Sequence, residues 1–212
     1  MARRRKRSGS FRASLIAFFA GFLLVGGLDL MHTLLGVQEY VTDFQLLPVV
    51  NWPWFIPLQM GLAGLLLLWG WQVSKKTIFE QIIRKDRRTV NRVDKPGPFM
   101  VLAIVMVLLG YILAWLLLGN AGHLNWYLGL YLLSLIVITL SLSKFHILAF
   151  LLISITGVVA ETLLLDPGLG YFRYPEPDLL GRAPAWLLFV YGWVGIFVHE
   201  LSKVIDQPRG GW

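Results

Sequence analysis

The chain has 212 residues, of which 57% are hydrophobic and only 15% charged, and its mean hydropathy is +0.66. So many apolar residues cannot be hidden in one soluble core, which predicts an integral membrane protein. The formal net charge is +7, but Lys and Arg gather at the ends of apolar runs instead of on one soluble face, which excludes a nucleic-acid-binding protein. The absence of cysteine excludes disulfides, thiolate metal sites and cysteine nucleophiles.

Six apolar runs follow one another along the chain. A bilayer core about 30 Å thick is crossed by roughly 20 helical residues, and each run is close to that length. The sequence therefore predicts an all-α, polytopic six-transmembrane-helix bundle, in one domain over 1–212, with spans at 14–35, 53–73, 99–118, 124–142, 147–165 and 184–201. The initial MARRRKR leads into the first run without a small-residue cleavage motif, so we expect a retained helix and not a signal peptide.

The distribution of Lys and Arg predicts the orientation. Seventeen of the nineteen lie in the N-terminus, the 74–98 loop, the 143–146 turn and the C-terminal tail. Positive charge stays on the cytoplasmic side, so both termini are expected in the cytoplasm, in a prokaryotic plasma membrane. The 74–98 loop carries isoleucines at helical spacing among its cations, which suits either a short helix bound to anionic headgroups or an ordinary basic loop.

Four polar side chains interrupt the spans at similar depth. Asp29 and His32 are three residues apart on one helix face and could share a hydrogen bond, while Gln59 and Glu161 lie near the outer ends of the second and fifth spans. If the first, second and fifth helices are neighbours, these groups line a polar pocket in the outer half of the bundle, beneath the 166–183 loop. The alternative is that they satisfy one another as interhelical contacts.

The four histidines argue against a metal centre, and no cofactor is expected. His32 and His123 fall at the outer ends of spans, and His146 and His199 at the inner ends, so no three can meet at one ion. His199 and Glu200 are adjacent and point about 100° apart on a helix, which predicts a solvated helix end beside Lys203.

Two segments resemble the Insig (insulin-induced gene) family. They are VQEYVTDFQLLPVVNWPWFIPLQMGLAGLLL and YFRYPEPDLLGRAPAWLLFVYGWVGIFVHEL, with their ordered Trp, Pro, Tyr and Gly residues, whereas GNAGHLNW replaces the acidic stretch that the family has between the third and fourth spans. The resemblance implies a lipid-binding bundle whose central helices enclose a sterol or another lipid. It also implies that the following residues shape the bundle and its closing loop: Trp54, Pro57, Gly61, Tyr171, Tyr174, Pro177 and Asp178.

The sequence thus predicts a lipid-binding membrane protein without catalysis. The ligand is expected to be a diacylglycerol- or sterol-like membrane lipid, held by the polar cluster and by an aromatic rim that includes Trp186. A membrane-protein partner or a homo-oligomer is also expected. One alternative is an enzyme that protonates an isoprenoid or carotenoid lipid, with Glu161 or Asp29 as the general acid. A second alternative is a small transporter with the same charges in a proton relay.

Overall fold

Six helices in the computed structural model are long and apolar enough to cross a membrane. The structure describes residues 2–40, 45–47, 50–79, 98–117, 123–164, 172–175, 177, 179 and 182–206. Within these residues the candidate spans are Ser10–Leu34, Ile56–Thr77, Phe99–Leu116, Leu124–Ser141, Lys144–Leu163 and Trp186–Ile205. The predicted all-α, six-span class is confirmed.

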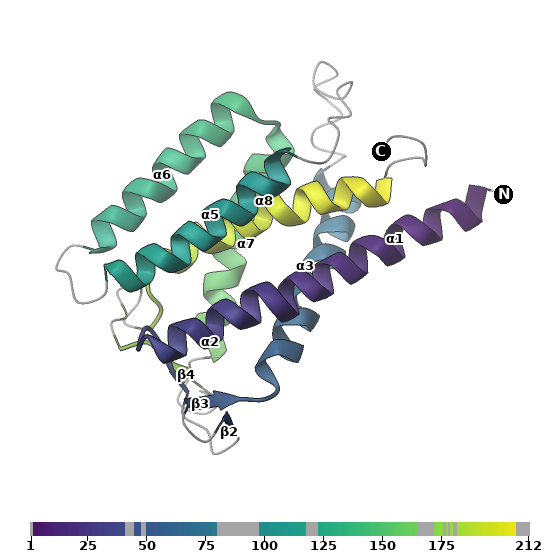
Figure 1. Ribbon diagram of the computed structural model, residues 1–212. Coiled ribbons are helices and arrows are strands. Elements are labelled where there is room, and N and C mark those ends of the chain that lie inside the picture. The colour runs from purple at the N-terminus through teal and green to yellow at the C-terminus, as the bar shows by residue number, and fades with distance from the viewer. Residues whose placement is uncertain are drawn as a thin grey trace.

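The first span is built from α1, η1 and α2, the second continues from α3 into η2, and each of the other four is a single long helix (Figure 1). In chain order the helices are α1 (Ala2–Phe19), η1 (Ala20–Val25, of wider π type), α2 (Gly26–Leu34), α3 (Ile56–Ser74), η2 (Lys75–Phe79, also π), α5 (Pro98–Leu116), α6 (His123–Ser141), α7 (Lys144–Leu164) and α8 (Trp186–Asp206). The described residues also include four short strands: β1 (Glu39–Tyr40), β2 (Gln45–Leu47), β3 (Val50–Pro53) and β4 (Phe172–Arg173).

The second span starts three residues later than the sequence pattern predicts. Val50–Pro53 pairs with Gln45–Leu47 as an antiparallel hairpin, so Pro53 belongs to a strand. Pro57 then falls in the first turn of α3, where its missing N–H costs nothing. Glycines bring α3 against the first span: a Cβ at Gly21 would overlap the carbonyl group of Met60.

Helix α8 is the central helix of the bundle. It packs against α5 and α7 over much of its length and also touches α1, α3 and α6. Accordingly, 61% of its span is buried, against 17% for α6. It packs closely against α7 at Gly192, where a Cβ atom would lie only 2.5 Å from the Phe150 ring. The sequence pattern places the sixth span at 184–201, and the helix itself runs for 21 residues, Trp186–Asp206, so it extends beyond Leu201.

A two-stranded pairing ties the connection after the first span to the segment before α8. Glu39 pairs with Arg173 and Tyr40 with Phe172 in the antiparallel β1–β4 ladder. An exposed ion pair between Arg173 and Glu39, 2.6 Å long, adds to this ladder. The pairing brings Phe172 and Tyr174 over the end of the bundle that carries Asp29.

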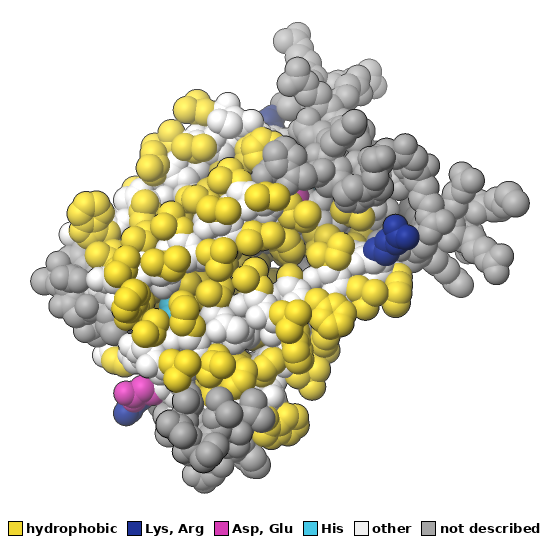
Figure 2. Space-filling model, in the orientation of Figure 1, with side chains coloured by type: hydrophobic (Ala, Val, Ile, Leu, Met, Phe, Trp, Pro, Cys, Tyr) yellow, Lys and Arg dark blue, Asp and Glu magenta, His cyan; other side chains and the backbone are white. Residues whose placement is uncertain are grey.

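The outer surface suits a hydrocarbon environment. Hydrophobic side chains cover most of the face shown in Figure 2, and the coloured Lys, Arg, Asp and Glu side chains lie mainly toward its margins. Large apolar side chains of α6 stand well exposed, with Leu140 at 81%. In water this exposure would be costly, whereas in a bilayer it is favourable. The protein is therefore an integral multi-pass membrane protein, and the cytoplasmic placement of its termini stays a prediction.

Candidate functional site: a cavity with two carboxyl groups

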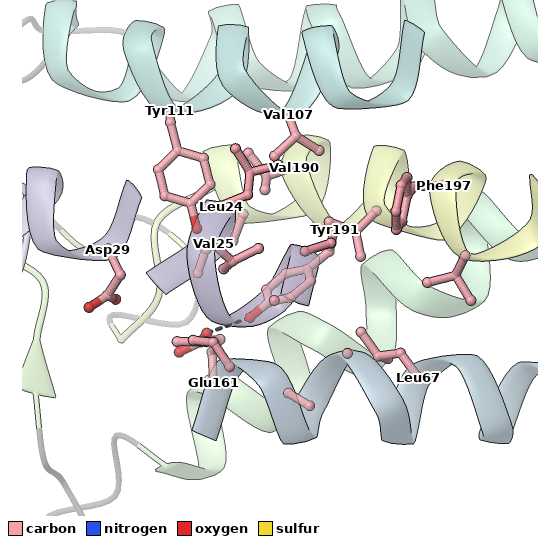
Figure 3. A pocket seen from close by; sticks show the side chains of 18 of the residues that line it. Leu24, Val25, Asp29, Leu67, Val107, Tyr111, Glu161, Val190, Tyr191 and Phe197 are labelled. Carbon is pink, nitrogen blue, oxygen red and sulfur yellow. Dashed lines mark hydrogen bonds between the residues drawn. The ribbon is translucent and has the colours of Figure 1, made fainter. Parts of the chain in front are cut away.

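An elongated cavity of about 120 Å³ lies between the first span, α3, α5 and α8. Its wall is mostly apolar, and its polar side chains gather at one end. Figure 3 shows Asp29 and Glu161 toward that end and Leu67 and Phe197 toward the other. One water molecule needs about 10–15 Å³ of such a cavity, so the space could hold several waters. Its wall, however, offers water few hydrogen-bond partners.

A second cavity, of about 330 Å³, lies between α3 and α7 and meets the first at Glu161 and Tyr191. Helix α7 packs mainly on α8, so it leaves room beside α3. Gln59 lines this second cavity, and so do Leu66 and Ala160, which are exposed on the outer surface of the bundle. The cavity system therefore opens sideways, toward the space that lipid occupies.

Asp29 is held by three donors from the segment that follows its own helix. Its Oδ1 accepts from Gln38 Nε2 at 2.5 Å, and its Oδ2 accepts from the Tyr40 hydroxyl and from Trp52 Nε1, both at 2.8 Å. A carboxylate is the acceptor-only group that can satisfy three donors at once. Asp29 thus fastens β1 and β3 to the end of α2.

Glu161 is satisfied on one side only. Its Oε1 accepts from the Tyr191 hydroxyl at 2.5 Å, a bond that joins α7 to α8 (Figure 3). Its Oε2 is buried and has no hydrogen-bond partner among the described residues. Gly157 makes this geometry possible, because any side chain there would overlap the ring of Tyr191. The result is a buried, unpaired acceptor on the wall of an apolar cavity.

His32 does not bond to Asp29, contrary to the expectation from their spacing. Its Nε2 lies 3.0 Å from the backbone oxygen of Tyr111, and its ring sits edge-on to Trp186 at 5.0 Å between centroids. The physical reason is that Asp29 has closer donors in the folded-back connection. His32 therefore joins α2 to α5 and α8.

The predicted pocket forms by a different arrangement from the one expected. Asp29 and Glu161 do line one cavity, but the fifth span reaches it by packing on α8 and not as a neighbour of the first and second spans. The sequence pattern could not reveal this arrangement, because it does not show that α8 lies between the first span and the fifth. Gln59 lies in the adjoining cavity, so the four polar groups do not form one cluster.

The residues implied by the family resemblance, and Trp186 of the predicted aromatic rim, lie in different parts of the structure. Pro177 is exposed. Tyr174 and Trp186 line the first cavity. Trp54 is exposed at 57%, whereas Pro57 packs against Gly26 and Gly61 lies beneath the ring of Phe18. These three are thus placed at the surface or in helix packing. Tyr171 and Asp178 lie outside the described residues, as does 80–97 of the basic loop.

The site also uses residues that sequence reasoning did not select. Gln38, Tyr40 and Trp52 close around Asp29, and Tyr111 and Tyr191 line the cavity. Burial raises the pKa of the Tyr40 hydroxyl, and the charge of Asp29 raises it further, so Tyr40 stays a neutral donor. Burial likewise raises the pKa of Tyr174 well above its usual value. The sequence did carry one signal for these partners: the polar side chains of Gln38 and Tyr40 follow soon after the helix that contains Asp29.

The start of α7 and the end of α8 differ from the prediction in another way. His199 and Glu200 are buried, at 3% and 0% exposure, and not solvated. Glu200 Oε1 contacts His146 Nε2 at 2.6 Å and Lys203 Nζ at 2.5 Å. Packing of α8 among the other helices removes both faces of this dipeptide from solvent. The expected proximity to Lys203 is present.

Six apolar helices around a laterally open, largely apolar cavity define a multi-pass helical membrane protein with an internal cavity. The fold is similar to that of MvINS, a mycobacterial Insig homolog from Mycobacterium vanbaalenii, with a TM-score of 0.69 and 18% sequence identity over 95% of this chain and 97% of that one. A structure of a cross-linked MvINS trimer matches with the same values. No protein-family model matches the chain, and a search of curated proteins found no match. The Insig-like architecture predicted from the two loop segments is confirmed at the level of the fold.

Proposed function

We propose that the cavity binds one hydroxyl-bearing neutral membrane lipid, of diacylglycerol or sterol type. The observation that carries the proposal is the unpaired Oε2 of Glu161 on a mostly apolar wall. A lipid hydroxyl donating to Oε2 would satisfy this atom, while the apolar part of the lipid would extend past Val107 and Val190 toward Phe197. An anionic phosphate headgroup, which offers acceptors only, would gain nothing from that carboxyl group.

The polar contact decides selectivity in this proposal. A lipid that leaves the bilayer exchanges one apolar environment for another, so burial of its chains contributes little net free energy. A hydrogen bond to a charged acceptor contributes about 1.5–3 kcal/mol, which is roughly a tenfold to hundredfold preference. The second cavity supplies the route, because its wall includes side chains exposed toward lipid.

The test is native mass spectrometry and lipid analysis of gently purified protein. Wild type should retain one lipid, and Glu161→Leu should reduce its occupancy about tenfold or more. Tyr191→Phe is the matched control for the loss of the bond between α7 and α8, and it should keep the lipid because Glu161 remains. Ala63→Phe fills a position that lines both cavities and should exclude the lipid, whereas Leu62→Phe on the exposed side of α3 should not.

Two outcomes would contradict the proposal. One is wild-type protein without lipid under conditions that preserve the lipid of a control membrane protein. The other is unchanged lipid occupancy in both Glu161→Leu and Ala63→Phe.

The enzyme alternative draws less support from the geometry. Asp29 accepts three hydrogen bonds, which suits an anion and not a proton donor. Only Glu161, buried in an apolar wall, retains the setting of a general acid. Under that alternative Glu161→Gln would abolish turnover while the protein stays folded, so the pigment and sterol profile of the host is the discriminating measurement.

We also propose that the chain forms a homo-oligomer in the membrane. Support comes from the cross-linked trimer of MvINS, whose fold is similar. The same native mass spectra measure the number of chains per particle, and spectra of monomer alone in mild detergent would refute it.

A further inference from the structure

A cluster of two imidazoles and a carboxyl group lies between α7 and α8, at the end of α8 away from Asp29. It comprises His146, His199 and Glu200, here called the His–Glu cluster, and all three side chains are buried. They are separate from the lipid cavity, whose lining residues on α8 extend from Trp186 to Val198. Nothing in the proposed lipid-binding function uses them.

Two atoms of the cluster are buried without a partner. His199 Nδ1 and Glu200 Oε2 have no hydrogen bond in the part of the chain that the structure describes. Each orphaned polar atom carries a desolvation cost, and such atoms commonly mark a water or an ion site. Glu200 Oε2 can only accept, and His199 Nδ1 accepts in the tautomer that carries its proton on Nε2, so a bound cation would satisfy both atoms at once.

The separation of the ligand atoms fits one ion. One atom from each of His146, His199 and Glu200 can be chosen so that all three lie within 4.8 Å of one another. Ligands about 2.1 Å from a tetrahedral metal lie about 3.4 Å apart, so small side-chain rotations suffice. The hydrogen bond between His146 Nε2 and Glu200 Oε1 opens in that movement.

His146 already has the support that a metal ligand requires. Its Nδ1 lies 2.8 Å from the hydroxyl of Ser143, which fixes the ring with Nε2 toward the cluster. Metal-bound histidines almost always have such a partner on their second nitrogen. Around His199, Trp71 packs edge-on and Phe145 packs face to face, with centroids 5.6 and 5.9 Å away. These rings hold the imidazole in place.

We propose that the His–Glu cluster binds one divalent first-row transition-metal ion of the Zn²⁺ type. Two imidazoles and one carboxylate suit zinc, cobalt, nickel or ferrous iron, whereas magnesium and calcium prefer oxygen alone. The ion joins the start of α7 to the end of α8. With three protein ligands, a fourth position remains for water or another ligand.

Lys203 limits the affinity of this site. Its Nζ contacts Glu200 Oε1 at 2.5 Å, and its side chain is 14% exposed, so the ammonium reaches toward water. Lys75 also lies near, over the ring of Phe145. A dication next to Lys203 is repelled, and removal of this charge should therefore tighten metal binding by about tenfold or more.

The experiment uses full-length protein in detergent, with an affinity tag that contains no histidine, after treatment with a chelator. Zn²⁺ is titrated by calorimetry and Co²⁺ by visible absorption, which reports tetrahedral coordination. We expect one ion per chain and a higher thermal midpoint with Zn²⁺ than with chelator. His146→Phe and His199→Phe should each weaken binding by about a hundredfold or more, and Ser143→Ala by about 10–100-fold.

Two controls separate the site from incidental binding. His123→Gln removes a histidine that lies at the far end of the bundle from the cluster and should leave the affinity unchanged. Lys203→Met should bind Zn²⁺ more tightly than wild type, which a purely structural ion pair does not predict. If wild type takes up no stoichiometric Zn²⁺ or Co²⁺, or if both phenylalanine variants keep full affinity, the proposal is wrong. The wild-type titration decides the matter even if a variant fails to fold.

Discussion

Replacement of Asp29 should destabilise the protein more than any change at an exposed carboxyl group. Asp29→Leu removes both carboxyl oxygens and introduces a larger side chain. The Tyr40 hydroxyl and Trp52 Nε1 lose this acceptor, and Gln38 Nε2 keeps only its 3.3 Å bond to the Tyr40 hydroxyl. Each orphaned donor costs about 1–3 kcal/mol, and because they belong to one network the sum is less than three separate losses. We expect a loss of about 3–5 kcal/mol, in the range for removal of one member of a buried charged network.

Asp29→Asn should cost less, about 1–3 kcal/mol, because one amide oxygen still accepts while the amide nitrogen meets donors. The assay is reversible unfolding in mixed micelles, followed by tryptophan fluorescence. Glu39→Gln is the control: that carboxyl group is 49% exposed and its pair with Arg173 contributes at most about 1 kcal/mol. A double-mutant cycle of Asp29→Asn with Trp52→Phe should show coupling above about 0.5 kcal/mol. The reasoning fails if Asp29→Leu unfolds with the same free energy as Glu39→Gln.

Two further predictions concern helix packing and alkaline pH. Gly195→Ala should lower the unfolding free energy by about 1–3 kcal/mol, because the new methyl group would overlap the backbone of Ala149. Gly129→Ala is the control: nothing lies within 4 Å of its new methyl group, so this change should be neutral or stabilising. Equal effects of the two changes would contradict the prediction. Stability should be constant toward pH 10 and fall above it, because the raised pKa of Tyr174 keeps its proton in the folded state while the unfolded state loses it near the usual value of 10.0. In Tyr174→Phe the fall above pH 10 should be smaller, as pH-dependent unfolding curves can measure, and an identical fall would show that Tyr174 is not responsible.

The amino-acid sequence by itself determined the class of the protein and the number of its spans. Apolar runs of bilayer length can be satisfied only by helices in hydrocarbon, so six runs mean six spans whatever their packing. Helix ends were less well determined, because they depend on local contacts. Pro53 pairs in a strand, and the sixth span continues past Leu201 because neighbouring helices cover its end. The order of Tyr, Pro and Trp in the loops was sufficient to indicate the Insig-like fold.

Tertiary structure alone decided which polar groups meet. The three-residue spacing of Asp29 and His32 places them on one face of a helix, yet Asp29 bonds to donors that fold back from the next segment. Glu161 shares a cavity with Asp29 only because α8 lies between their helices and presents Tyr191. His146 and Glu200 are hydrogen-bonded although they are 54 positions apart in the chain. Spacing along a helix reports which side chains share a face, but the neighbour that each face meets depends on how all six helices pack, and that information is distributed over the whole chain.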